Sequence, residues 1–374
     1  MSLGRGHRQP GETPLLSVVI PSHEGSTDWL GDCVASVLAQ DCPEVPEIVV
    51  VFDGDAPRAS RLVRELAPAV RQLPLSRARG FAGAAAEGIR IARGNLVALL
   101  NDDATLEPSW ITAMITASKE EPNAGSFASR IVSASEPELL DSAGHGLTRW
   151  GEAFAIGAGL PDGPAWDQAR FVFGAPATAA VFRRELLRDC GGFDPSMEAY
   201  LEDVDLSLRA QIAGFPCLYV PEARVRHRGS ASYGWGSSGT GRAERLASRN
   251  RIHLLLKSMP RNTLRASVPA ILTSILADLT HRSLSRSHPT AALMGAVEGL
   301  RAARSSLGAR AAALGHRRVS DDWIRQVLRD SELALVDLAS EPEAGRWRRS
   351  RASLSGFLTS WVDRRELRQT RNTY

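Results

Sequence analysis

The sequence predicts an α/β fold, with a mainly parallel sheet flanked by helices and an α-helical C-terminal extension. Three observations lead to this prediction. Short apolar runs alternate with amphipathic segments through the first part of the chain, and such strand–helix alternation is typical of βαβ units. Polar clusters directly follow the expected strands, where sheets of this kind bind ligands. Beyond residue 241 the strand signals vanish, and helical periodicity dominates an Arg- and Ala-rich sequence.

The individual elements follow from apolar patterning and from turn residues. The expected strands are Leu16–Ile20, stopped by Pro21, then Glu47–Phe52, Leu96–Leu100, Phe171–Phe182, Cys217–Val220 and Arg224–His227. The expected helices are Trp29–Ala39, Ala59–Leu66, Ala82–Ala92, Glu107–Ser118 and Leu201–Ala213. Residues 133–170 are rich in Gly, Pro and Asp and are expected to form an irregular, substrate-facing region. The Gly/Ser-rich stretch 230–241 is expected to be a mobile loop.

Composition and charge restrict the class of protein. The 374 residues are enough for one large domain with a smaller addition, or for two domains. The content of 43% hydrophobic and 23% charged residues is ordinary for a folded protein. A formal net charge of +3 gives no general case for nucleic-acid binding. The four cysteines lack the paired spacing of metal ligands, which favours a reducing, cytosolic compartment.

We expect three parts along the chain. Residues 1–14 form a flexible N-terminal tail without the apolar core of a signal peptide, residues 15–241 form the sheet-based domain, and residues 242–374 form the helical extension. No stretch reaches the roughly 18–20 apolar residues of a membrane-spanning helix. The protein is therefore expected to be cytoplasmic, and at most peripheral on the inner face of the cell membrane.

The first candidate site is Asn101-Asp102-Asp103, directly after the third apolar strand. Two carboxylates at a strand end can hold a hard divalent cation, which bridges a diphosphate and neutralises charge on a leaving group. A solvated turn is the plain alternative, because Asn and Asp favour turns. The apolar strand before the cluster and the helix start after it favour the metal site.

The second candidate is Glu202-Asp203, with Asp205 close behind, at the start of a predicted helix. The favourable electrostatics of a helix N-terminus would by itself account for these carboxylates. An ionised carboxylate in a cleft can also accept a proton from an attacking hydroxyl group.

The third candidate is His227, which lies between Arg226 and Arg228 at the end of an extended segment. A lone His is usually a surface residue or a hydrogen-bonded core residue. Neutral imidazole is nevertheless a common ligand of ions such as Mn²⁺. The two arginines suit either phosphate or solvent.

Six motifs occur in a fixed order. They are Ser17–Glu24, Glu47–Gly54, Arg79–Ala84, Leu99–Asp103, Gly191–Asp194 and Glu202–Leu206. Each is weak alone, but their order and spacing over residues 15–232 resemble the GT-A-fold family 2 glycosyltransferases, and most of all the bacterial rhamnosyltransferase-type branch. The resemblance implies a Rossmann-like GT-A catalytic domain. It also implies transfer of a sugar, rhamnose or another hexose, from a nucleotide-diphosphate donor to a glycan, lipid-linked or small-molecule hydroxyl in cell-wall or polysaccharide biosynthesis.

The resemblance gives each matched residue a role. The residues that would bind the donor are Pro21, His23, Glu24, Asp53, Gly80, Phe81 and Asp102. Asp103 and His227 would hold a divalent cation, Mg²⁺ or Mn²⁺, and Asp102 would contact the ribose or this metal. Asp203 would be the general base, with Glu202 beside it ordering the acceptor. A base opposite the leaving group gives a single displacement with inversion.

Two stretches depart from the family pattern. Where relatives commonly carry Asp-Asn-Gly-Ser or Asp-Asp-Gly-Ser, this chain has Phe52-Asp53-Gly54-Asp55. The carboxylate that reads the base is therefore shifted, which leaves the base open. Asn residues frequent around the loop 80–83 are replaced by Ala, which leaves the donor sugar open.

The extension contains an apolar helical face flanked by cationic residues. The apolar residues are Leu264, Val268, Ile271, Leu272, Ile275, Leu276 and Leu279, and the flanking residues are Arg261, Arg265, His281, Arg282 and Arg286. Such a helix can lie in a membrane interface or pack on the catalytic domain. The Arg-rich tail, with Trp347 and Trp361, suits a membrane surface, a nucleic acid or a solvated helix. A lipid-linked acceptor, common among similar enzymes, favours the membrane.

Two other functions remain open. A sugar-phosphate nucleotidyltransferase has a related topology, but it usually carries a Gly-rich, basic loop after its first strand, where this chain has Pro21–Glu24. A catalytically inactive sugar-nucleotide-binding protein would be expected to lose some of the acidic and His residues that are intact here. An NAD-dependent oxidoreductase is disfavoured, because no Gly-x-Gly-x-x-Gly follows the first strand.

Overall fold

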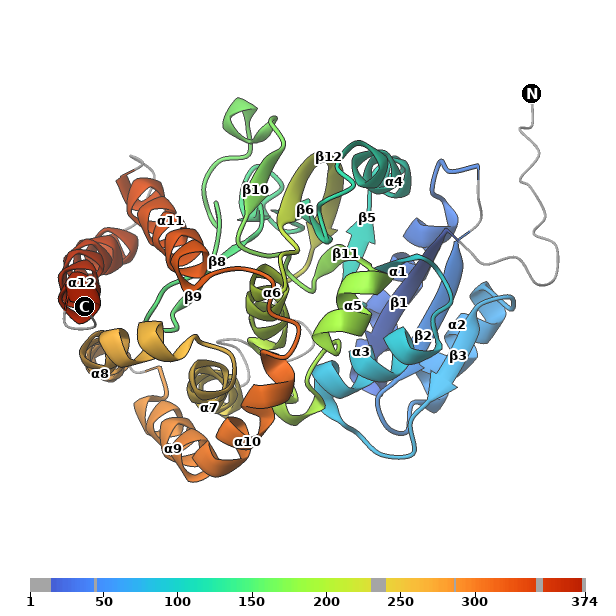
Figure 1. Ribbon diagram of the computed structural model, residues 1–374. Coiled ribbons are helices and arrows are strands. Elements are labelled where there is room, and N and C mark those ends of the chain that lie inside the picture. Colours follow the sequence, from blue (N-terminus) through green and yellow to red (C-terminus); the bar gives the residue numbers. More distant parts are fainter. Residues whose placement is uncertain (1–14, 44–45, 230–239, 286, 341–345, 372–374) are drawn as a thin grey trace.

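A computed structural model describes residues 15–43, 46–229, 240–285, 287–340 and 346–371. The predicted tail 1–14 and most of the predicted loop 230–241 lie outside these residues. The described chain forms a mixed sheet with helices on both faces, and a group of further helices lies beside it (Figure 1). The predicted α/β class with a helical C-terminal region is confirmed.

The strands differ in length. They are β1 Leu16–Ser22, β2 Glu47–Phe52, β3 Arg71–Pro74, β4 Leu96–Leu100, β5 Ala104–Leu106, β6 Ser126–Ser133, β7 Leu140–Ser142, β8 His145–Leu147, β9 Ala153–Ala155, β10 Arg170–Val172, β11 Ala179–Arg183 and β12 Cys217–His227. Of those described, β12, β6 and β1 are the longest. Their main order is β10-β12-β6-β11-β4-β1-β2-β3. Neighbours from β4 to β3 are parallel, as are β6 and β12, whereas β11 is antiparallel to β4 and β6.

The helices divide into those that cover the sheet and those of the C-terminal region. The first group comprises α1 Thr27–Leu38, α2 Pro57–Leu66, α3 Gly80–Ile91, α4 Trp110–Glu120, α5 Arg184–Cys190 and α6 Glu202–Ile212, with short 3₁₀ turns at Glu24–Ser26, Pro164–Trp166 and Pro195–Met197. The second group comprises α7 Arg242–Lys257, α8 Arg261–Ser285, α9 Pro289–Arg301, α10 Ala303–Ala313, α11 Asp321–Ser340 and α12 Arg346–Arg371.

Three expectations about the strands were wrong in detail. β1 continues through Pro21, which is tolerated because the pairing with β4 ends at Val19, so no ladder bond to β4 is lost. The expected strand 171–182 is two strands, β10 and β11, in different parts of the sheet. The two pieces expected around Pro221 are one strand, β12, with a register shift between Val220 and Arg224. The stretch 133–170 also contains β7, β8 and β9.

Two apolar cores hold the helices to the sheet. One face packs against α1, α2 and α4 through residues such as Val34, Val63 and Trp110. The other face packs against α3, α5 and α6 through residues such as Ile89 and Leu206. Because both faces are covered, β1, β2 and β4 are buried along their whole length, and only their ends are available for ligands.

The C-terminal helices share a third core with α6. Leu208 of α6 packs in one cluster with Leu254 of α7, Ile271 of α8 and Ile324 of α11. A buried ion pair adds to this contact, since Arg149 Nη2 lies 2.8 Å from Glu332 Oε2 of α11. The helical region is therefore packed on the sheet-based part.

Candidate active site

The chain segments that follow β1, β2 and β4 lie together at the carboxyl ends of these parallel strands, which form one edge of the sheet. Ser22 pairs with Phe52 at the ends of two parallel strands, so the residues after them are neighbours. A pocket with an empty volume of about 320 Å³ lies there, and its walls include residues from four segments. The lining residues are Pro21, Ser22, His23, Asp53, Phe81, Ala84, Asn101 and Asp102. Five of the seven residues predicted to bind the donor thus line one pocket.

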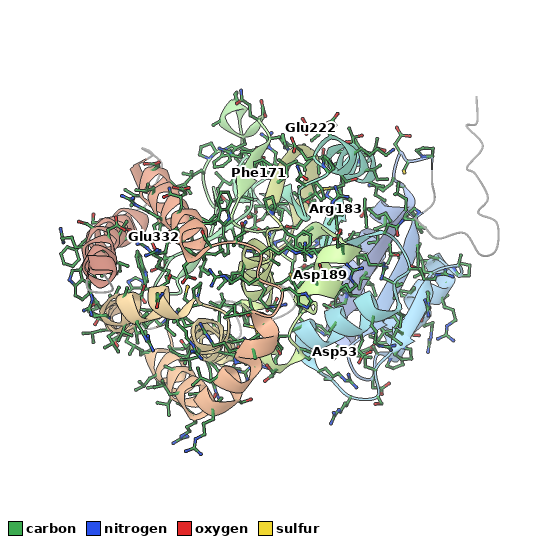
Figure 2. The ribbon with its side chains drawn as sticks, viewed as in Figure 1. Asp53, Phe171, Arg183, Asp189, Glu222 and Glu332 are labelled. Carbon is green, nitrogen blue, oxygen red and sulfur yellow. The ribbon has the colours of Figure 1, made fainter. Side chains whose placement is uncertain are left out.

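Asp53 fixes the loop on the far side of this pocket. Its Oδ1 accepts a hydrogen bond from the Arg79 backbone N–H at 2.6 Å, and its Oδ2 accepts one from the Gly80 N–H at 2.9 Å (Figure 2). Gly80 has a φ of +74°, and a Cβ there would lie 2.6 Å from the backbone oxygen of Glu198. Only glycine fits this position without strain. Phe52 is 1% exposed and does not line the pocket.

Glu24 is a predicted donor-binding residue that makes different contacts. Its carboxylate Oε2 accepts hydrogen bonds from the backbone N–H groups of Arg58 and Ala59, at 3.1 and 3.4 Å. These donors belong to the first turn of α2, where a carboxylate is favoured electrostatically. Glu24 therefore ties the end of β1 to α2, and it does not line the pocket.

The end of β12 places His227 beside Asp103. The Nε2 atom of His227 lies 3.3 Å from Asp103 Oδ1, and its Nδ1 atom lies 2.7 Å from Asp141 Oδ2. Burial lowers the pKa of His227, but the hydrogen bonds to Asp103 and Asp141 and their charges outweigh it and raise the pKa to about 9. Sequence reasoning missed Asp141, which lies in the stretch expected to be irregular.

The donor set of this cluster fits a small divalent cation. A carboxylate and an imidazole face each other, and Asp141 is placed to orient the imidazole as outer-shell carboxylates do in metal sites. Within the described residues, no three His, Cys, Asp or Glu side chains are grouped to hold a metal. Ions such as Mg²⁺ often take only one or two protein carboxylates and complete their shell with substrate phosphates and water. Asp103 and His227 are the side chains of this cluster that could hold such an ion, once His227 gives up the proton that its raised pKa retains.

Asp203 lies at the same sheet edge. Its Oδ2 accepts a hydrogen bond from the Ala177 N–H at 3.0 Å, and its Oδ1 accepts one from the Val204 N–H at 2.8 Å. The neighbouring Thr178 accepts a bond from the Asn101 N–H at 2.8 Å, which links this segment to the Asp102-Asp103 strand end. These two backbone amides fix the orientation of the Asp203 carboxylate, and the side chain is still 19% exposed.

Glu202 and His145 are ionisable neighbours of Asp203, and burial shifts the pKa of each. Burial, followed by the charge of Asp203, raises the pKa of the Glu202 carboxyl well above its usual range. The buried His145 places Nδ1 3.8 Å from Asp203 Oδ2 and hydrogen-bonds Ser207 through Nε2. Burial lowers the pKa of His145, against the opposing charge of Asp203. The accessible carboxylate of the pair is therefore Asp203.

A strained turn precedes these carboxylates. Glu198, Tyr200 and Leu201 all have positive φ, at +58°, +70° and +66°, which for each such residue costs about 1–3 kcal/mol. The side-chain amide of Asn250 on α7 donates hydrogen bonds to the backbone oxygens of Met197, Ala199 and Tyr200, each at 2.8 Å. The helical region thus holds the turn that positions Asp203. No local sequence motif marked Asn250 for this role.

Residues 17–191 match the family described as Glycosyl transferase family 2. This part of the chain therefore resembles a family 2 glycosyltransferase domain. Its fold is also similar to that of a crystal structure of GalNAc-T7 with UDP, GalNAc and Mn²⁺, with a TM-score of 0.51 and 16% identity. That likeness covers 66% of this chain and 48% of the other, and it concerns the fold alone.

Curated relatives of the glycosyltransferase domain act on different sugars. A glucosyl-dolichyl phosphate glucuronosyltransferase of Haloferax volcanii is 26% identical over 228 residues, which is 57% of this chain and 69% of that protein. An N-acetylglucosaminyl-diphospho-decaprenol L-rhamnosyltransferase of Mycobacterium tuberculosis is 30% identical over 149 residues, which is 37% of this chain and 48% of that protein. The two relatives are therefore named for the transfer of different sugars.

Proposed function

We propose that the protein is an inverting, metal-dependent glycosyltransferase. It moves a hexose, rhamnose or another, from a nucleotide-diphosphate donor to a hydroxyl group of a glycan, lipid-linked or small-molecule acceptor. The observation that carries this proposal is the shared edge, where the oriented carboxylate of Asp203, the pair Asp103–His227 and the pocket around Asp53 adjoin. The domain boundaries 15–241 and 242–374 are part of the proposal.

The chemistry follows from what each side chain can do. The donor nucleotide occupies the pocket beside Asp53 and Asp102, and Asp203 accepts the proton of the acceptor hydroxyl. The hydroxyl oxygen forms a bond to the anomeric carbon while the bond from that carbon to the diphosphate breaks. A cation held by Asp103 and His227 would neutralise charge on the leaving nucleoside diphosphate. Two backbone amides keep the carboxylate of Asp203 in position, so little reorganisation is needed.

A donor panel tests this function. TDP-, UDP- and GDP-linked sugars are incubated with Mn²⁺ or Mg²⁺, and the released nucleotide and phosphate species are quantified. We expect nucleoside diphosphate from one donor, at a rate that rises when an acceptor is added. Release of pyrophosphate from a sugar phosphate and a nucleoside triphosphate would instead indicate a nucleotidyltransferase. Donor binding without turnover in every condition would indicate an inactive binding protein, and either result overturns the proposal.

We also propose peripheral membrane contact through α8 from the cytoplasmic side. Within the described residues, no helix combines the length and apolar content needed to cross a membrane. The predicted apolar face of α8 is divided between two surroundings. Ile271 is buried in the third core, whereas Val268, Leu272 and Leu276 are 45%, 64% and 66% exposed. The exposed Arg261 and Arg265 lie on the same helix, which suits anionic lipid.

Two further observations bear on this membrane contact. The two relatives above are named for dolichyl and decaprenol substrates, which supports a lipid-linked acceptor. In the tail, however, Trp361 packs against the third core and not outward. The side chains of Arg346 to Arg351, with Trp347, and residue Arg286 lie outside the described part of the chain. The membrane proposal therefore rests on α8.

Replacing both Leu272 and Leu276 with Asp is expected to lower binding to phosphatidylglycerol vesicles by at least about tenfold. Each exposed Leu would contribute about 1.5–3 kcal/mol when buried in lipid. Co-sedimentation measures the bound fraction. The control is Leu38→Asp, a similar change at an exposed Leu of α1. Equal binding of the double variant and the wild type, or no binding of the wild type, would contradict the membrane contact.

A further inference from the structure

A second cavity lies between the glycosyltransferase domain and the helical region. Its empty volume, which includes space open to solvent, is about 720 Å³. Glu152, at the start of β9, and Leu201, before α6, form one wall. Ser248 and Arg251 of α7 and Asp278 and Arg282 of α8 form the other. Figure 1 shows these helices beside β9 and α6, on the side of the molecule away from β1 to β3.

Leu201, which lines this cavity, is close in the chain to the proposed base Asp203. Leu201 precedes Asp203 by two positions, so their Cα atoms are at most about 7 Å apart. Leu201 belongs to the strained turn that Asn250 holds, which fixes the cavity wall relative to α6. The donor pocket has different walls and lies at the ends of β1, β2 and β4. A molecule in the second cavity would therefore leave the donor pocket free.

The charges of the cavity balance one another. Asp278 and Arg282 form an ion pair at 2.8 Å, and Glu152 accepts a hydrogen bond from the indole N–H of Trp150 at 3.2 Å. Arg251 donates to the backbone oxygen of Trp150 at 2.9 Å. An anion would face two carboxylates here, which is unfavourable. A neutral polyol can donate to carboxylates and accept from guanidinium groups, and Leu201 can cover its apolar C–H face.

We propose that this cavity binds the neutral sugar ring of the acceptor and directs its hydroxyl group toward Asp203. The inference rests on the proposed glycosyl transfer and names a binding site for its second substrate. It assigns acceptor recognition to the contact between the glycosyltransferase domain and α7 and α8. The residues that distinguish acceptors would then be Glu152, Ser248, Asp278 and Arg282.

The test measures binding of simple acceptor analogues without a donor. Methyl glycosides of glucose, N-acetylglucosamine and rhamnose are titrated against the full chain, and binding is followed by saturation-transfer NMR. Ser248→Phe fills the cavity, and Asp278→Asn removes a carboxylate at nearly constant shape. We expect at least one glycoside to bind the wild type, and each variant to weaken its binding by about tenfold or more. The control Asp330→Asn alters an exposed carboxylate of α11 outside the cavity and should bind like the wild type.

Two results would overturn the acceptor site. One is the absence of binding by every glycoside in the panel, and the other is unchanged binding in Asp278→Asn and Ser248→Phe when both variants melt like the wild type. These outcomes are independent of the proposed reaction, because the donor panel can still release nucleoside diphosphate. Conversely, a chain that binds a glycoside at this cavity but turns over no donor would contradict the reaction and leave the cavity assignment in place.

Discussion

Replacing Asp203 with Asn is expected to lower kcat for glycosyl transfer by about 10³-fold, within the range for loss of a general base. The amide keeps the shape of the carboxylate but cannot take up the proton of the acceptor hydroxyl. The donor pocket lies on other segments, so KM for the donor should change by less than about threefold. Initial rates at saturating acceptor, with varied donor, measure both constants.

Glu202→Gln separates the two adjacent carboxylates. Glu202 is 6% exposed, and its environment disfavours the ionised form, so the neutral amide resembles the carboxyl group already present. We expect a loss of less than about tenfold, far smaller than for Asp203→Asn. The surface variant Asp337→Asn controls for the change in charge. If Asp203→Asn retains more than a tenth of the wild-type rate, or Glu202→Gln is the more damaging change, Asp203 is not the base.

The anomeric configuration of the product gives a second check on Asp203. A single base opposite the leaving group requires inversion at the anomeric carbon. NMR of the purified product reports the configuration directly. A retained configuration would contradict the single displacement, whatever the rates of the variants.

Local sequence patterns were sufficient for the elements that build the donor side. The strands β2 and β4 begin and end where their apolar runs predict, because both are buried on both faces. β3 was not predicted, because Arg71–Pro74 is an edge strand with no buried residue and so lacks the apolar pattern of a buried strand. The donor pocket was predictable because parallel strands align their ends, so residues that follow each strand become neighbours.

The acceptor side depended on contacts that no local pattern encodes. Asp141 reaches His227 across 86 positions, and His145 reaches Asp203 from the same stretch, which lacks regular apolar spacing. The side-chain amide of Asn250 donates hydrogen bonds to three backbone carbonyls. Because every residue has a backbone carbonyl, the sequence does not show which of them a side chain will contact. The amphipathic face of α8 was visible in the sequence, but its division between core and solvent depends on how α8 packs against its neighbours.

Replacing Asp103 with Ala is expected to abolish the metal-stimulated part of the reaction, a fall of at least about a hundredfold. Asp103 is 3% exposed and faces His227, so its loss removes the carboxylate of the proposed metal site. Nucleoside diphosphate release is measured with and without EDTA, over a range of Mn²⁺ concentrations. A wild type unaffected by EDTA, or an Asp103→Ala variant still stimulated by Mn²⁺, would contradict the metal assignment.

Asp141→Asn distinguishes a metal ligand from a side chain that orients one. Asp141 contacts the far nitrogen of His227, Nδ1, at 2.7 Å, and outer-shell partners of this kind typically change metal affinity by about 10–100-fold. We therefore expect the Mn²⁺ concentration for half-maximal rate to rise by that factor, while the rate at saturating Mn²⁺ stays within about threefold of the wild type. The control is Asp32→Asn, which removes a carboxylate paired with the neighbouring Arg228 on the exposed side. A fall in the saturated rate with unchanged Mn²⁺ dependence would instead place Asp141 in contact with a substrate, because a residue acting only through the metal ligand changes occupancy and not the chemical step.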